Sequence, residues 1–100
     1  MGSVIDGFDW DDANREKCSK HGVKIAEIEA LLSGLPHVAP DPRHSETEVR
    51  LIAIGRNVFG RPMFVAFTIR TKQGRRLLRP ISARYMHAKE IRAYGKAESA

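Results

Sequence analysis

The sequence has a single cysteine, no long apolar run and, in its second half, very few acidic residues. With only Cys18 among 100 residues, an internal disulfide is excluded and a reducing compartment is indicated. No apolar run approaches the ~20 residues of a membrane-spanning helix, and the opening MGSVIDGFDW lacks the basic and apolar parts of a signal peptide. We therefore expect a cytoplasmic protein that does not bind a membrane.

The composition predicts one folded domain over residues 1–100. A chain of this length has room for a single hydrophobic core. Its 42% hydrophobic and 29% charged residues, with five prolines and eight glycines, separate it from disordered proteins.

Positive charge is concentrated in the second half of the chain. Residues 1–50 carry six Lys or Arg and ten Asp or Glu, a balance of −4, whereas residues 51–100 carry eleven and two, a balance of +9. Arginine outnumbers lysine, and a guanidinium binds phosphate with two hydrogen bonds at once. Basic charge also serves solubility alone, but this polarity favours a nucleic-acid ligand.

The order of hydrophobic patterns predicts an α+β fold. The expected elements are a strand at 8–10, helices at 11–20 and 25–34, strands at 47–56, 62–70 and 75–84, and a helix at 86–94. Residues 37–46, which contain two prolines, are expected to form an extended linker. The order β-α-α-β-β-β-α predicts an antiparallel sheet of about four strands with helices on one face.

The face that the helices leave open is expected to carry arginines. If the helices cover the apolar side of the 62–70 strand, the other side presents Arg70, joined by Arg50 and by Arg79 or Arg84 from neighbouring strands. A single arginine is more often a solvated charge, whereas three on one concave face indicate an anion site.

Several motifs together resemble one protein family. They are F-x-W at 8–10, K-H-G-V at 20–23, D-P-x-H-S-E at 41–46, E-x-R-x-x-x-I-G at 48–55 and R-x-I-S-A-R at 79–84. In this order and spacing they resemble the BrnT toxins of bacterial type II toxin–antitoxin systems, over a core of about residues 8–94. Pro80 departs from the aliphatic residue usual in the family, so we expect a bulge or a distorted strand edge there.

The resemblance implies a RelE-like fold and a ribonuclease that uses neither a metal nor a cofactor. It also implies a BrnA-like antitoxin of the ribbon-helix-helix type, through which alone operator DNA would be bound. In such a reaction the 2′-hydroxyl of the RNA attacks the adjacent phosphorus. The protein must then stabilise charge on the phosphate, accept one proton and donate another.

The positions that match the family pattern supply candidates for these tasks. Arg50, Arg79 and Arg84 are expected to stabilise the phosphate. His21 and Lys20 are candidates for proton transfer, although His21 could instead bond the end of the first helix and Lys20 could be a solvated charge. Asp41 and Glu48 could orient an arginine, and His44 is more simply a loop residue.

Other residues are expected to bind RNA outside the cleavage site. Arg70 is a weaker fourth arginine, and Lys89 and Arg92, three apart on the last helix, would face outward toward flanking phosphates. Trp10, Phe8 and Phe64 could stack on a base, although core packing is the alternative for each. The four histidines and one cysteine show no paired ligand spacing, so we expect no metal site.

A second hypothesis is a non-catalytic protein that binds nucleic acid or forms a complex in operon repression. Such a protein has no need to direct Arg50, Arg79, Arg84 and His21 at one point. The two hypotheses therefore differ in whether these side chains meet.

Overall fold

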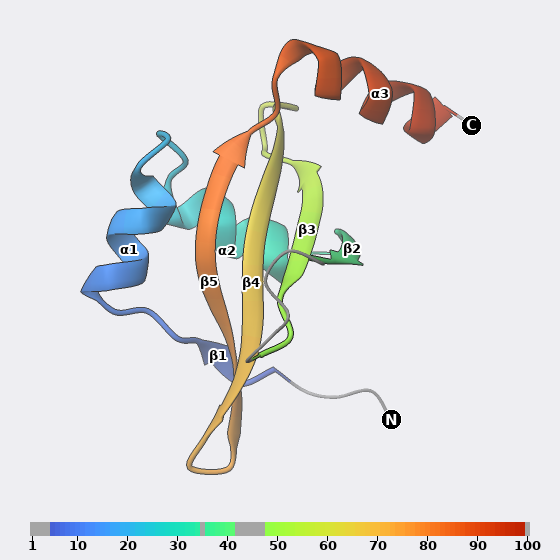
Figure 1. Ribbon diagram of the computed structural model, residues 1–100. Helices are drawn as coiled ribbons and strands as arrows, with labels where there is room; N and C mark the ends of the chain where they lie inside the picture. Colours follow the sequence, from blue (N-terminus) through green and yellow to red (C-terminus); the bar gives the residue numbers. More distant parts are fainter. Residues whose placement is uncertain (1–4, 35, 42–47, 100) are drawn as a thin grey trace.

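The computed structural model describes residues 5–34, 36–41 and 48–99. Its elements are β1 (Gly7–Phe8), α1 (Asp12–Ser19), α2 (Ile25–Ser33), β2 (His37–Pro40), β3 (Leu51–Arg56), β4 (Pro62–Lys72), β5 (Arg75–Tyr85) and α3 (Ala88–Ser99). They form one five-stranded sheet in the order β1-β5-β4-β3-β2 (Figure 1). The α+β class is confirmed.

The prediction of about four antiparallel strands is wrong in two respects. Residues 37–40, expected to be linker, form the edge strand β2, which pairs antiparallel with β3. All four residues of β2 are exposed, so no alternation of apolar and polar residues marked it as a strand. The short β1 runs parallel to β5, which makes the sheet mixed.

Three element boundaries also differ from the prediction. The strand expected from 47 begins at Leu51, and residues 42–47, including His44, lie outside the described residues. The strands expected to end at 70 and to begin at 75 are joined by a turn of only two residues, Gln73 and Gly74, both with positive φ. The last helix continues through Gly95 to Ser99 instead of ending at Tyr94.

The start of α1 ties three elements together. Asp11 is the N-cap, because its carboxylate accepts from the backbone N–H of Asn14 while the Asn14 side chain accepts from the N–H of Asp11. The Asn14 amide also donates to the carbonyls of Asp9 and Pro80, at 2.9 Å each. The residues that cap this helix therefore also anchor it to β5.

Pro80 lies at a β-bulge, one of the two arrangements expected from the sequence. In the β4–β5 ladder, Ala66 pairs with Ser82 and Phe67 pairs with Pro80, so Ile81 is the extra residue. A bulge interrupts the regular ladder where proline cannot donate a hydrogen bond.

The core lies between the sheet and the helices α1 and α2. It is formed by the buried side chains of Cys18, Val23, Ile28, Leu31, Ala53, Met63, Val65, Phe67, Leu78 and Ala83. Burial raises the pKa of the Cys18 thiol to about 11, in keeping with the apolar role expected for this cysteine. None of the described helices is long and apolar enough to cross a membrane.

The opposite face of the sheet is left open by this packing. In Figure 1, α2 passes behind the sheet and α1 lies beside β5. The helix α3 projects from the end of β5, past the end of β3, and packs on neither face. The open face and the space under α3 are therefore the places where a ligand or partner can approach.

Candidate functional site

A hollow of about 360 Å³ lies on the open face of the sheet. Two rows of paired residues line it. Ile52, Ala66 and Ser82 form one row across three strands, and Phe64 and Arg84 form the other. The rest of the lining is His21, Asp41, Arg50 and Ala83. We call this space the catalytic hollow. It brings together three of the five predicted catalytic residues: His21, Arg50 and Arg84.

Arg84 is held in place from three directions. Its Nη1 and Nη2 donate to the two carboxylate oxygens of Glu90, at 2.8 Å each, and Nη1 also donates to the carbonyl of Tyr85 at 3.2 Å. Its guanidinium lies over the Phe64 ring, 4.7 Å from the ring centroid. The hydrogen bonds to Glu90 raise the pKa of Arg84, and those from Arg84 lower the pKa of Glu90 to about 2.

This arrangement leaves part of the guanidinium available. Arginine has five N–H groups, and three of those of Arg84 are used by Glu90 and Tyr85. The two that make no hydrogen bond with the described residues are on Nε and Nη2. They are parallel and form a second fork that matches two oxygens of a phosphate.

Arg50 supplies a second guanidinium that is free of ion pairs. Its side chain is half-buried, and within the described ranges it forms no salt bridge and no side-chain hydrogen bond. Its backbone carbonyl accepts from the N–H of Asp41 at 2.9 Å, which joins the segment after β2 to the start of β3. Arg84 therefore borders the catalytic hollow from β5, and Arg50 borders it from the position directly before β3.

His21 reaches the catalytic hollow from the connection between α1 and α2. It is exposed, and its ring makes no hydrogen bond with any residue that the structure describes. The connection turns at Gly22, which has φ of +86°, as expected from the sequence. The neighbouring Lys20 is also exposed, at the C-cap of α1, but does not line the hollow.

Arg79 does not join the other arginines. Its guanidinium forms ion pairs with Asp9 at 3.4 Å and with Asp11 at 2.9 Å, and its side chain is only 14% exposed. These pairs connect β5 to the start of α1. The pKa of Asp11 is lowered by the hydrogen bond from the backbone N–H of Asn14, by the Arg79 guanidinium and by the N–H of Ala13. The structure thus gives Arg79 partners at the junction of β1, α1 and β5 and does not direct it at the catalytic hollow.

The predicted RNA-binding residues lie in different surroundings. Arg70 pairs with Glu48 at 3.3 Å, so Glu48 does contact an arginine, as the sequence suggested. Lys89 and Arg92 are exposed on α3, as expected. Trp10 packs against the core, donates from its ring N–H to Glu29 at 3.0 Å, and has Arg15 over its ring, which is the packing alternative stated for it.

Two features of the site were missed by reasoning from the sequence. One is Glu90. The sequence indicated it by its position as an acidic residue in the first turn of the helix that follows the strand containing Arg84. The other is the contact of the Phe64 ring with Arg84, since this ring was expected either to pack in the core or to stack on a base. Within the described part of the chain, no group of His, Cys, Asp and Glu side chains could hold a metal ion.

The fold and the catalytic hollow define a small basic α+β domain with two arginines and a histidine around one concavity. The model of BrnT, the ribonuclease toxin of type II toxin–antitoxin systems, matches residues 10–90. This match covers most of the chain, so the protein belongs to the BrnT family of ribonuclease toxins, and a toxin of this type has an antitoxin partner. No curated protein matches the sequence significantly.

Proposed function

We propose that this BrnT-family protein is a metal-independent endoribonuclease with a RelE-like fold. It would cleave RNA in the cytoplasm by attack of the RNA's own 2′-hydroxyl, and so inhibit translation and growth. The observation that carries the proposal is the meeting of His21, Arg50 and Arg84 at one hollow, with both arginines retaining free N–H donors.

The arginines would stabilise the scissile phosphate. As the 2′-oxygen bonds to phosphorus and the bond to the 5′-oxygen breaks, negative charge builds on the equatorial oxygens. The free fork of Arg84 can donate to two of them, and Arg50 approaches from the start of β3, on the far side of β4. Donors already fixed in position stabilise the transition state without reorganisation during the reaction.

His21 would carry the protons. The 2′-hydroxyl must lose a proton and the 5′-oxygen must gain one, and an imidazole suits both steps at neutral pH. Lys20, next to it in the chain, is the second candidate for proton transfer. The products would be a 2′,3′-cyclic phosphate and a 5′-hydroxyl.

The RNA on either side of the cleaved bond would be held by cations outside the hollow. Lys89 and Arg92, both exposed on α3, would contact flanking phosphates, and Arg70 would add a weaker contact because Glu48 already pairs with it. Trp10 and Arg79 would take no part, since Trp10 is packed and bonded to Glu29, and Arg79 is paired with Asp9 and Asp11.

The antitoxin would be BrnA-like, a ribbon-helix-helix protein encoded beside the toxin. Operator DNA would be bound through it and not by the toxin itself. What supports this is the family and the basic character of the chain, whose net charge is +5.

The test is cleavage of a labelled single-stranded RNA by the purified protein in excess EDTA. We expect cleavage to continue and to leave 2′,3′-cyclic or 3′-phosphate ends, identified by mass spectrometry. Arg84→Ala is the control against a contaminating nuclease. Activity that disappears in EDTA and returns with Mg²⁺ would refute the mechanism.

A further inference from the structure

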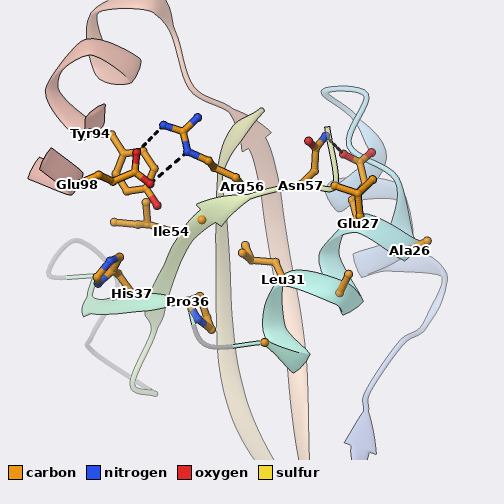
Figure 2. Close-up of a pocket in the computed structure, with 14 residues that line it drawn as sticks. Ala26, Glu27, Leu31, Pro36, His37, Ile54, Arg56, Asn57, Tyr94 and Glu98 are labelled. Carbon is orange, nitrogen blue, oxygen red and sulfur yellow. Dashed lines mark hydrogen bonds and ion pairs between the residues drawn. The ribbon is translucent and has the colours of Figure 1, made fainter. Parts of the chain in front are cut away.

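A second concavity, of about 550 Å³, lies between α2, the outer edge of β3 and α3 (Figure 2). Its apolar lining includes Ala30, Leu31, Pro36, Ile54 and Val58. It shares no lining residue with the catalytic hollow. We call it the groove.

The groove exists because the sheet ends early at this edge. β2 begins opposite Ile54, so the last residues of β3 have no neighbouring strand on that side. At Gly55 an added Cβ would lie 2.4 Å from Leu31 Cδ1, which means that α2 packs directly on the backbone of β3. The wall formed by α3 is held across the gap by the ion pair of Arg56 with Glu98 (Figure 2).

The turn between β3 and β4 presents large apolar side chains beside the groove. Val58 is 85% exposed and Phe59 is 89% exposed. The turn is fixed, because the Asn57 side chain accepts from the N–H groups of Phe59 and Arg61 and donates to Glu27 of α2 at 2.7 Å. Two exposed apolar side chains on a fixed turn, next to an apolar groove, are typical of a protein–protein interface.

The carboxylates and the arginine that line the groove are already bonded. Arg56 forms an ion pair with Glu98, and Glu27 accepts from Asn57 and Tyr85. A partner segment would therefore contact this surface mainly through apolar side chains.

The two sides of the groove, formed by α2 and α3, favour a helical partner segment over an extended one. Ala26 and Ala30 are exposed and lie one turn apart on α2. Because their side chains are small, a second helix can approach α2 closely on this side. On the other side, Tyr94 and Glu98 are four apart on α3 and form a parallel wall (Figure 2). A helix with an apolar stripe would lie between them, as in other helix-in-groove complexes.

We propose that the groove and the Val58–Phe59 turn form the docking site for an amphipathic helix of the antitoxin. The proposal rests on the proposed function, since it takes the partner from the toxin–antitoxin system. It adds that the antitoxin is held outside the catalytic hollow. The complex would thus gain its affinity from a surface that does not contact the reacting phosphate.

The test is calorimetric titration of the purified antitoxin, encoded beside the toxin gene, into four forms of the toxin. Ala30→Arg changes an exposed residue that lines the groove, and Phe59→Glu changes an exposed residue of the turn beside it. Val49→Glu is the matched control, because Val49 is 68% exposed at the other end of β3. We expect each groove variant to bind at least about 30-fold more weakly than the parent, and the control to bind within about twofold. The free groove variants should cleave RNA at the parent rate.

Two other results of these binding measurements would refute the docking site. Parent affinity in both groove variants, or no binding by the parent, means that the antitoxin does not dock there. Loss of RNA binding in the groove variants, with antitoxin affinity intact, means that the groove binds RNA. If the parent does not cleave RNA, the proposed nuclease activity is refuted. The titration still shows whether the antitoxin binds at the groove.

Discussion

Replacement of Arg84 by lysine separates the geometry of the guanidinium from its charge. Lysine keeps the positive charge, so long-range attraction to RNA should change little. It loses the planar group that lies over Phe64 and that bonds both oxygens of Glu90. It also loses the free fork formed by Nε and Nη2.

The size of the effect follows from the number of donors removed. Two parallel N–H groups of Arg84 are free to meet the phosphate, and removing one preorganised donor to a developing oxyanion typically lowers the rate by about 100- to 1,000-fold. We therefore expect Arg84→Lys and Arg84→Ala alike to slow the cleavage step by about 100-fold or more. Glu90→Gln keeps the fork but loosens its orientation, and should slow cleavage by about tenfold.

The assay is single-turnover cleavage of a short RNA at saturating enzyme, so that binding does not enter the rate. Thermal unfolding of each variant checks that the fold is retained. If Arg84→Lys cleaves at the parent rate, charge alone matters at this position. If Arg84→Ala does so as well, Arg84 lies outside the reaction, and the non-catalytic hypothesis gains support.

Three further predictions test other parts of the structure. Arg79→Ala should lower the free energy of unfolding by about 3 kcal/mol, measured with urea, because it removes a partner of the buried Asp9 carboxylate; unchanged stability would contradict this. The pKa of Glu90 is lowered from 4.5 to about 2, so its contribution to stability is complete above about pH 4.5 and disappears as the pH falls toward 2. The difference in the free energy of unfolding between the parent and Glu90→Gln should therefore shrink over that range. A difference that stays constant would contradict this. Lys89→Ala and Arg92→Ala should weaken RNA binding mainly at low salt and lessen its salt dependence, while the saturated cleavage rate stays at the parent value.

Much of the fold was predictable because its signals are local. The cap at Asp11, the turn at Gly22 and the long strands β4 and β5 each follow from a few adjacent residues. β2 was not predictable in this way, because a strand of four exposed residues has no apolar face. The parallel pairing of β1 depends on contacts with β5, about 70 residues away in sequence.

The candidate site was predictable only in part for the same reason. Arg84 lies on β5 and Arg50 directly precedes β3, in segments whose alternation was visible in the sequence, and the structure brings both to one hollow. Arg79 was expected beside them because it lies on the same strand as Arg84. Its ion pairs with Asp9 and Asp11 are tertiary contacts, which no spacing within residues 79–84 reveals.

The helix α3 connects the two surfaces to which we assign function. Its first turn holds Arg84 at the catalytic hollow through Glu90, and its last turn closes the groove through Glu98 and Arg56. Both ion pairs are partly exposed to water, and such pairs hold a helix weakly because solvent and salt screen them. A partner helix that packs against α3 in the groove therefore has only weak contacts to overcome when it shifts α3. Any shift of the first turn would move Glu90, and with it the free fork of Arg84. Inhibition from the groove then requires neither occupation of the catalytic hollow nor neutralisation of its arginines.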